Sequence, residues 1–255
     1  MLVLLSPAKG QNFDPRQTEV RVSEPRLLSK SNELIEILRL YSPDELMALM
    51  NVSEKIGNLT AERFASFTTP FNELNAKPAA FAFSGDVYRG LAIDDFTEND
   101  LEFAQNHIRI LSGLYGVLRP LDLIQPYRLE MGTRLDTKAG SDLYQYWGSS
   151  ISECLMEDLE EHEDDLVINL ASNEYFKAVN GEDIQANVST PVFKDFKNGK
   201  YKIISFFAKN ARGAMARWIV KEQAQKASDL FDFRESGYEY SEELSEVNSP
   251  VFLRG

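Results

Sequence analysis

Cysteine, histidine and long apolar runs are scarce in this chain of 255 residues, and their scarcity excludes several classes of protein. The one cysteine, Cys154, cannot form an internal disulfide or a two-thiol redox switch, and it fits a reducing cytoplasm. The two histidines, His107 and His162, have no paired cysteines beside them, so the sequence predicts no metal site. No apolar run approaches the roughly 18 residues of a membrane span. The start, MLVLLSPAKG, lacks the basic residues of a secretory signal and predicts a short buried strand.

Positive charge is also in short supply, and it is unevenly distributed. The formal net charge is −13, and Glu153 to Asp165 holds eight acidic residues without any lysine or arginine. Lys194 to Lys226, in contrast, holds nine basic residues against two acidic ones, a local charge of +7. A chain this acidic is not a general nucleic-acid coat, although a local basic patch can still bind an anion. Taken alone, such a run is most simply a solvated surface.

The basic run contains SFFAKNARGAMARWIV, Ser205 to Val220, where the spacing predicts a helix from about Asn210 to Gln225. A helical wheel places an apolar arc opposite a basic one. The apolar arc holds Ala211, Met215, Trp218 and Ile219, and the basic arc holds Lys209, Arg212 and Arg217 around Gly213 and Ala216. Small residues between cations would let the phosphates of a ligand approach the backbone, and the helix N-terminus would add positive potential. We therefore expect an anion site; the alternative is a basic face paired with the chain's many acids.

Periodicity and capping residues predict one α+β domain of mixed sheet and helices over residues 1–255. Ser42 before Pro43, and Thr97 three residues before Asp100, are typical helix starts. Asn198-Gly199 between two alternating segments predicts a β-hairpin. The predicted strands are 2–5, 79–83, 108–111, 166–170, 192–196 and 201–207. The predicted helices are 27–40, one that begins at 43, breaks at 55–60 and resumes at 61–67, then 97–107, 142–161 and 210–225.

Four further arginines lie in or beside a central region rich in glycine and proline. They are Arg109, Arg119, Arg128 and Arg134. The rigid guanidinium fork suits phosphate, so these arginines are candidate phosphate ligands. The alternative is that they pair with the acids nearby, which are Asp122, Glu130 and Asp136.

The sequence contains few motifs that are typical of enzymes. No Gly-Lys-Ser/Thr follows the central glycines, and neither Gly-x-Gly-x-x-Gly nor Gly-x-Ser-x-Gly occurs. Asp86, Asp122 and Glu130 could serve acid–base chemistry, but their spacing does not pair them.

Several motifs resemble the YaaA peroxide-stress-response family. They are LLSPAK (4–9), FSGDVYRGL (83–91), LSGLYGVLRPLDLIQPYRLEMGTRL (111–135), LYQYWG (143–148), NLASNEYFK (169–177) and AKNARGAMAR (208–217). The resemblance extends from the first predicted strand nearly to the C-terminus, and its central motif is too long for chance. It implies a cytoplasmic bacterial protein that is induced by hydrogen peroxide, keeps free iron low and limits oxidative damage to DNA and protein.

The resemblance also implies an α+β fold with a positively charged cleft that binds DNA and a helix-hairpin-helix element. The expected cleft residues are Lys9, Arg109, Arg119, Arg128, Lys209, Arg212 and Arg217. The helix-hairpin-helix maps to Val52–Phe67, with Lys55 beside a turn at Gly57 and Asn58. Such turns usually contain two glycines; here Asn58 has to supply any second left-handed residue. DNA affinity would come from phosphate contacts, with little sequence readout.

Two classes of function stay open on the sequence alone. The first is a DNA-binding protein without catalytic activity, and the second is an enzyme that acts on a nucleotide or nucleic-acid base in the same cleft. The first is favoured, with DNA in duplex, bent or bubble form as the partner, no membrane contact, no cofactor and a monomeric state. A closed pocket around Asp122 or Glu130 would favour the enzyme, and an open basic groove would favour the binding protein.

Overall fold

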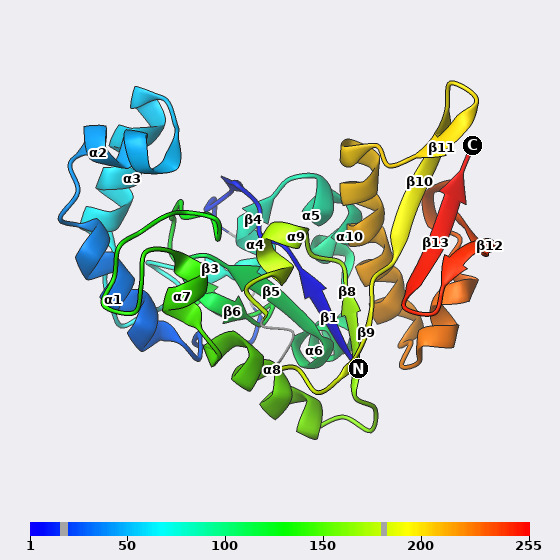
Figure 1. Ribbon diagram of the computed structural model, residues 1–255. Coiled ribbons are helices and arrows are strands. Elements are labelled where there is room, and N and C mark those ends of the chain that lie inside the picture. The colour runs from blue at the N-terminus through cyan, green and yellow to red at the C-terminus, as the bar shows by residue number, and fades with distance from the viewer. Residues whose placement is uncertain (16–19, 180–182) are drawn as a thin grey trace.

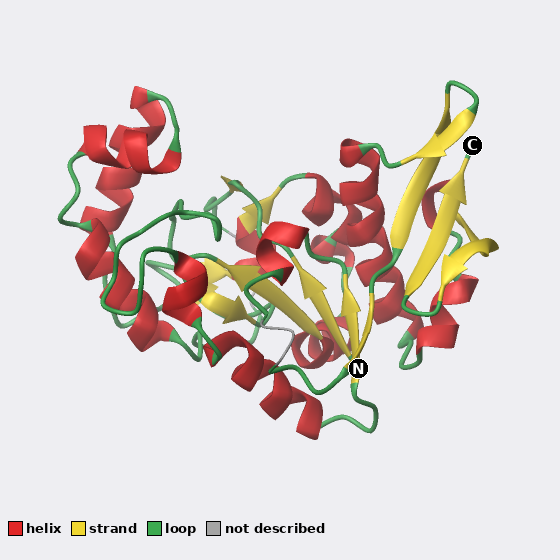
Figure 2. Ribbon diagram, viewed as in Figure 1, coloured by secondary structure: helices red, strands yellow, loops and turns green. Residues whose placement is uncertain are grey.

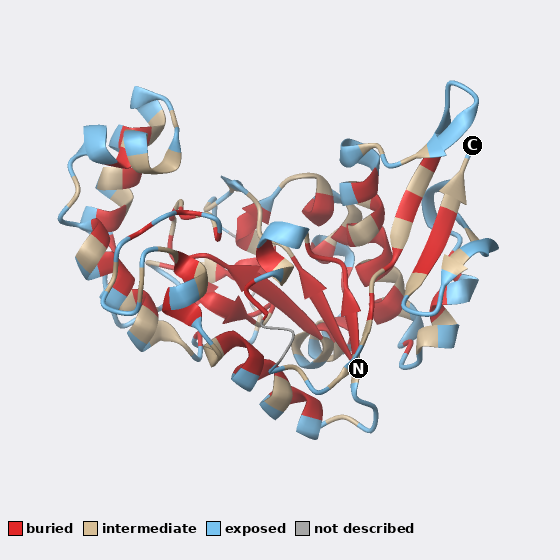
Figure 3. Ribbon diagram, viewed as in Figure 1, coloured by how far each residue is buried: buried red, intermediate tan, exposed pale blue. Residues whose placement is uncertain are grey.

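A five-stranded sheet forms the centre of the protein, and the carboxyl ends of its parallel strands point to the upper side in Figure 1. The computed structural model describes residues 1–15, 20–179 and 183–255. The sheet order is β6-β5-β1-β8-β9, with β1 parallel to β5 and β8 and with β6 antiparallel. The bounds are β1 Leu2–Leu5, β5 Ile108–Ser112, β6 Gly116–Leu118, β8 Leu166–Asn169 and β9 Asn187–Ser189. The continuous apolar run of β1 is buried along its whole length, as a strand at the centre of a parallel sheet requires (Figure 3).

A second sheet of four strands lies beside the C-terminal helix. Its order is β11-β10-β13-β12, with β10 and β13 parallel and the other two pairs antiparallel. The bounds are β10 Val192–Lys197, β11 Lys200–Lys202, β12 Glu239–Glu246 and β13 Ser249–Arg254. Two short ribbons complete the strands: β2 Gly10–Gln11 with β4 Phe83–Ser84, and β3 Lys77–Pro78 with β7 Leu123–Ile124. Helices and mixed sheets together confirm the α+β prediction (Figure 2).

Helices cover the central sheet and join it to the second one. The long helices are α1 Leu28–Leu38, α2 Pro43–Met50, α3 Glu54–Ser66, α6 Glu98–His107, α8 Ser150–Glu160 and α10 Ser205–Glu222. The short helices are α4 Ala79–Ala82, α5 Asp86–Leu91, α7 Leu143–Trp147 and α9 Asn173–Phe176, with 3₁₀ turns η1 Ile93–Asp95, η2 Ala227–Asp232 and η3 Glu235–Gly237. Helix α10 contacts α5 and β1 on one side and β10 on the other, so it connects the two sheets (Figure 1).

Two helix starts form as the sequence predicts. The Ser42 side chain accepts a hydrogen bond from the Glu45 amide at 3.3 Å, and the Thr97 side chain accepts one from the Asp100 amide at 3.2 Å. The predicted strand 2–5 is confirmed, and so is the hairpin, in which Asn198 and Gly199 both have positive φ. One cluster of buried apolar side chains runs from Met1 to Phe252.

Four predicted elements differ from the structure. Residues 79–83 form α4 and the start of β4 rather than one strand, because the run of alanines favours a helical turn. The predicted helix 142–161 breaks at Gly148, whose φ of 49° ends α7 in the left-handed region. Predicted strand 201–207 ends at Lys202, and α10 therefore begins five residues earlier than expected, at Ser205.

The predicted helix-hairpin-helix turn is wrong, because Gly57 and Asn58 lie inside the continuous helix α3. Helices α2 and α3 do pack together, but their connection is centred on Asn51, which has a φ of 50°. Gly57 is buried where a Cβ atom would lie 2.3 Å from Cγ of Met47. The glycine is therefore needed for close packing of the two helices, and Lys55 stands in the first turn of α3 instead of beside a loop.

In the ranges 1–15, 20–179 and 183–255, none of the helices combines the length and the hydropathy that a membrane crossing requires.

Candidate functional site

The loop that follows β1 lies at the carboxyl end of the central sheet, next to the segment that follows β8. The amide of Ser172 donates a hydrogen bond of 2.8 Å to Oγ of Ser6, and the two hydroxyls are 3.4 Å apart. Open sheets with parallel strands place their ligands outside the carboxyl ends of the strands. This edge of the sheet is therefore where a ligand site is expected.

A small pocket at this edge contains two of the predicted cations. Its lining consists of Pro7, Ala8, Lys9, Gln11, Tyr127, Arg128, Leu129, Glu130 and Tyr175. Oε1 of Glu130 lies 3.0 Å from Nζ of Lys9 and 3.0 Å from an Nη atom of Arg128. The Lys9 side chain is 66% exposed, and Nε of Arg128 is buried without a hydrogen-bond partner. The Glu130 carboxylate thus pairs with both Lys9 and Arg128, and these two side chains still have N–H groups free to donate hydrogen bonds.

A third cation at this edge comes from α3. Arg63 donates a hydrogen bond of 3.4 Å to the carbonyl of Tyr127. Burial and, to a lesser extent, the charge of Arg128 lower the pKa of Arg63, which shows that the two guanidinium groups are close. No carboxylate of the described residues forms an ion pair with Arg63. Lys9, Arg63 and Arg128 are called the edge cations below. Among the described residues Glu130 is the one carboxylate that pairs with this group, and it pairs with Lys9 and Arg128. The sequence analysis missed Arg63, which no motif marks.

Three tyrosines lie beneath the edge cations. The Tyr88 hydroxyl donates to the carbonyl of Ser6 at 3.1 Å, and the Tyr127 hydroxyl lies 2.7 Å from Oγ of Ser112. Burial raises the pKa of Tyr88, Tyr127 and Tyr175. At neutral pH these hydroxyls keep their protons, so they act as hydrogen-bonding groups rather than as bases.

A second group of predicted cations lies on α10. Lys209 is exposed, and neither Lys209 nor Arg212 has an ion pair or side-chain hydrogen bond within the described chain. Burial lowers the pKa of the Arg212 guanidinium, because its charge is partly removed from water. A partly buried cation without a partner is unfavourable unless an anion joins it. Lys209 and Arg212 are called the helix cations below.

Helix α5 connects the two groups of cations. Its start lies beside the loop after β1: a Cβ atom built on Gly85 would be 3.5 Å from Cβ of Ala8. At the same end, the Asn210 side chain donates a hydrogen bond of 3.4 Å to the carbonyl of Asp86. The N-terminal half of α10 is therefore one short helix away from the loop that carries Lys9.

The small residues of α10 have a different role from the predicted one. A Cβ atom on Gly213 would lie 1.8 Å from the carbonyl oxygen of Val87, and one on Gly90 would lie 2.1 Å from that of Asn210. Gly213 and Gly90 therefore allow α5 and α10 to pack backbone against backbone. They do not open a path for a ligand, and this part of the sequence prediction is wrong.

Arg217 is held by neighbouring groups. One Nη atom lies 3.4 Å from Oδ2 of Asp95 and donates to the carbonyl of Ala92 at 3.3 Å, while the guanidinium covers the Phe96 ring. It is less available to a ligand than Lys209 or Arg212.

Arg109 is not available either, which corrects its placement among the cleft residues. It is 4% exposed in β5, and Nε donates to Asp158 at 2.6 Å while Nη1 donates to the carbonyls of Gln105 and Ile108. A phosphate cannot reach it. Arg26, which the sequence analysis overlooked, forms two further bonds to Asp158 at 2.9 Å and 2.7 Å. This network is part of the core.

Arg119 takes part in a second structural network. Its Nη2 atom lies 2.9 Å from Oδ1 of Asp122, and it also donates to the carbonyl of Glu24. Asp122 is 1% exposed and additionally accepts hydrogen bonds from Ser23 and from the Arg119 amide. Asp122 therefore stabilises a loop and has no opening to a substrate, and Arg119 has little capacity left for phosphate.

The remaining chemical candidates are accounted for by local packing. Asp86 pairs with Arg89 one helical turn away, and Cys154 is buried in α8, where burial raises the pKa of its thiol. His107 stacks on Phe103, and burial lowers its pKa to about 4, so it is neutral near pH 7. Across the described residues, His, Cys, Asp and Glu form no group of three or more that could hold a metal ion.

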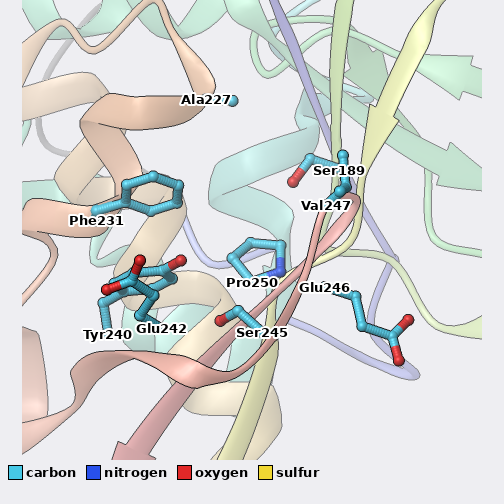
Figure 4. Close-up of a pocket in the computed structure, with 9 residues that line it drawn as sticks. All are labelled: Ser189, Ala227, Phe231, Tyr240, Glu242, Ser245, Glu246, Val247 and Pro250. Carbon is cyan, nitrogen blue, oxygen red and sulfur yellow. The ribbon is translucent and has the colours of Figure 1, made fainter.

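A larger pocket lies in the C-terminal part and contains none of the predicted residues (Figure 4). It measures about 210 Å³ and lies beside β12 and η2. Phe231 and Tyr240 stack within it at 4.2 Å, and Glu242 and Glu246 contribute carboxylates. An anion would be repelled here.

Comparisons with known proteins agree with the motifs. The family profile described as "Peroxide stress protein YaaA" matches residues 1–244. A UPF0246 protein of Tolumonas auensis is 53% identical to the chain over 254 residues, and one of Shewanella halifaxensis is 52% identical. A third, from Idiomarina loihiensis, is 50% identical. The alignments cover 100% of the chain and 98% to 99% of each relative.

Proposed function

The chain belongs to the peroxide stress protein YaaA family, and from this membership we propose that it binds DNA during peroxide stress. The proposed contacts are the edge cations Lys9, Arg63 and Arg128 and the helix cations Lys209 and Arg212. Binding uses the phosphates of the DNA backbone and therefore has little sequence specificity.

The observation that carries the proposal is that the five edge and helix cations of this acidic protein outnumber their carboxylate partners. Lys9 and Arg128 share the carboxylate of Glu130, and neither Arg63 nor the two helix cations have a carboxylate partner among the described residues. The chain has 40 acidic and 27 basic side chains, so acids to neutralise these five were plentiful. Leaving five cations with one carboxylate between them costs folding free energy, and an external anion restores it.

In this proposal, the protein protects DNA from oxidation by occupying its phosphates. Protein bound along the phosphates displaces cations from the DNA surface, because binding releases condensed counterions. Iron ions held there would be displaced with the others, and less hydroxyl radical would then form next to the bases. Limited oxidative damage thus requires no iron site in the protein and no catalytic step.

Replacing Lys209 or Arg212 with glutamine should weaken binding to all DNA sequences about equally. Each lost phosphate contact should reduce the slope of log affinity against log salt by about 0.9. Arg212→Lys should also lose affinity, because an ammonium cannot reproduce the forked contact of a guanidinium. Fluorescence anisotropy of labelled duplexes of two unrelated sequences, over a series of salt concentrations, measures both quantities.

Lys138→Gln is the matched control, since Lys138 is an exposed lysine outside both groups of cations. An equal loss of affinity in Lys138→Gln and Arg212→Gln would mean that total charge governs binding and that the five cations form no site. Gel analysis of the DNA recovered from the same incubations tests the enzymatic alternative, because cleavage or base removal would appear there.

A further inference from the structure

One face of the second sheet leaves large apolar side chains exposed to water. Phe193 and Phe252 point to the other face, where their ring centres lie 6.1 Å and 5.7 Å from that of Phe233. Side chains alternate along a strand, so Phe196 on β10 points the opposite way, as does its cross-strand partner Tyr201. Phe196 is 53% exposed and Tyr201 is 41% exposed, at the pale blue upper end of this sheet in Figure 3. The face that carries these two rings is called the outer face below.

A row of three side chains crosses the outer face and has opposite charges at its two ends. Leu253 on β13 is the partner of Lys194 on β10 and also of Glu239 on β12. The lysine and the glutamate therefore stand on either side of Leu253, each about 4.8 Å from it across the sheet. Neither forms an ion pair within the part of the chain that the structure describes. Two unpaired charges of opposite sign thus flank an apolar side chain.

The lysines of the β10–β11 hairpin do not add charge to the outer face. Lys197 and Lys200 are partners, and Lys202 is the partner of the buried Asp195, so all three lysines point to the inner face. Glu246 does lie on the outer face, but it occupies the last position of β12, beside the turn. The central part of the outer face therefore contains one cation and one anion.

We propose that the outer face binds a second copy of this chain, sheet against sheet, about a two-fold axis that runs along β13. Rotation about this axis exchanges the two sides of the sheet. Lys194 of each copy then faces Glu239 of the other, and Leu253 faces Leu253. The two Phe196 rings approach each other near the axis. Gly255 stands beside each ring and has no side chain to block this approach, since a Cβ atom there would lie 2.3 Å from Cβ of Phe196.

Charge complementarity favours a second copy over other occupants of the outer face. A two-fold interface requires a surface that is complementary to itself, and a cation and an anion on opposite sides of an apolar centre satisfy this requirement. Nucleic acid would instead meet two glutamates, Glu239 and Glu246, against the single Lys194. The proposal is independent of DNA binding, because none of the five edge and helix cations belongs to a strand of this sheet.

The size of the outer face predicts a weak dimer. Four strands about 4.8 Å apart, with six residues in β13 at about 3.3 Å each, give a face of about 20 Å by 20 Å. Contacts of this size belong to the reversible class of interfaces. We therefore expect a monomer–dimer equilibrium with a dissociation constant in the micromolar range, whereas the sequence analysis expected a monomer.

Reversal of one charge in the row tests the geometry of the dimer. Lys194→Glu brings a glutamate against Glu239 of the second copy, and Glu239→Lys brings a lysine against Lys194. Each variant should weaken self-association at least about tenfold, because the repulsion occurs twice in each dimer. Sedimentation equilibrium over a series of protein concentrations measures the dissociation constants. Lys138→Glu is the matched control, because Lys138 is an exposed lysine outside both sheets, and it should leave self-association unchanged.

A one-to-one mixture of the two charge variants separates repulsion from misfolding. In the mixed dimer the introduced glutamate faces the introduced lysine, and the unchanged Lys194 faces the unchanged Glu239. The mixture should therefore dimerise about as tightly as the unmodified protein. Phe196→Ser removes apolar contact instead, so it should weaken self-association and should not be rescued by mixing with either charge variant.

Three results would each overturn the dimer. They are an unmodified protein that stays monomeric up to about 100 µM, charge variants that associate as the unmodified protein does, and a mixture of charge variants that stays monomeric. Dimers that form and are rescued by mixing, in a protein that binds no DNA, would overturn only the proposed function. DNA binding by a protein that stays monomeric would overturn only the dimer.

Discussion

Asp158→Asn is expected to lower the free energy of unfolding by about 3–5 kcal/mol, because it leaves the buried Arg109 without a counter-charge. Arg109 is 4% exposed, and its Nε atom lies 2.6 Å from Oδ2 of Asp158. Arg26 binds both oxygens of the same carboxylate. Burial opposes ionisation of Asp158, but Arg109 and Arg26 outweigh it and lower its pKa. Chemical denaturation at pH 7 measures the loss.

Two controls separate this ion pair from a general packing defect. The double variant Arg109→Met with Asp158→Leu removes both buried charges and should recover most of the lost stability. The difference between the unmodified protein and Asp158→Asn should also depend on pH. Since the folded-state pKa of Asp158 is lowered, its stabilisation is present above the ordinary value near 4 and is lost as the pH falls through the folded value. A difference that is constant between pH 7 and pH 3 would contradict the ionic explanation.

Gly213→Ala is expected to destabilise the protein by about 3 kcal/mol or more and to abolish most DNA binding. The new Cβ atom would lie 1.8 Å from the carbonyl oxygen of Val87, so α5 and α10 have to separate. The clashing atom belongs to the backbone, which cannot move aside as the end of a flexible side chain can. The loss of stability is therefore expected at or above the upper end of the usual range for overpacked cores. Separation also moves the helix cations relative to the edge cations, so both unfolding and DNA affinity should be measured.

Gly132→Ala is the matched control for this interface. A Cβ atom there would lie 3.4 Å from a carboxylate oxygen of Glu174, the mobile end of a side chain, and the change should cost little. Equal stability of Gly213→Ala and Gly132→Ala would contradict backbone contact between α5 and α10 at Gly213.

Elements with local signals could be predicted from the sequence. Ser42 and Thr97 cap helices through contacts within one turn, and Asn198-Gly199 satisfies the positive φ angles of a hairpin by itself. Gly57 shows where such reasoning fails. A glycine in a polar stretch usually indicates a turn. At Gly57, however, the absence of a side chain makes room for Met47 of α2. Contacts between helices leave no local signal.

The cations of the candidate site likewise could not be sorted from the sequence into available and buried ones. Arg109 and Arg128 both belong to the central arginine-rich region, and nothing in the sequence distinguishes them. The structure buries Arg109 against Asp158, which is 49 residues away in the chain, and leaves Arg128 beside a pocket. Arg63 contacts Tyr127, which lines that pocket, because α3 ends next to it. Pairing between distant segments therefore decides which cations stay available, and single-sequence patterns do not record it.

The dependence of DNA binding on salt tests the central claim most directly. If the three edge cations and two helix cations contact phosphates, log affinity for a paired duplex should fall linearly with log salt, with a slope of roughly −4.5. Binding of the unmodified protein between about 50 and 200 mM salt gives this slope. A steep linear fall is the predicted result. A flat dependence, or no binding at the lowest salt concentration, would contradict the account.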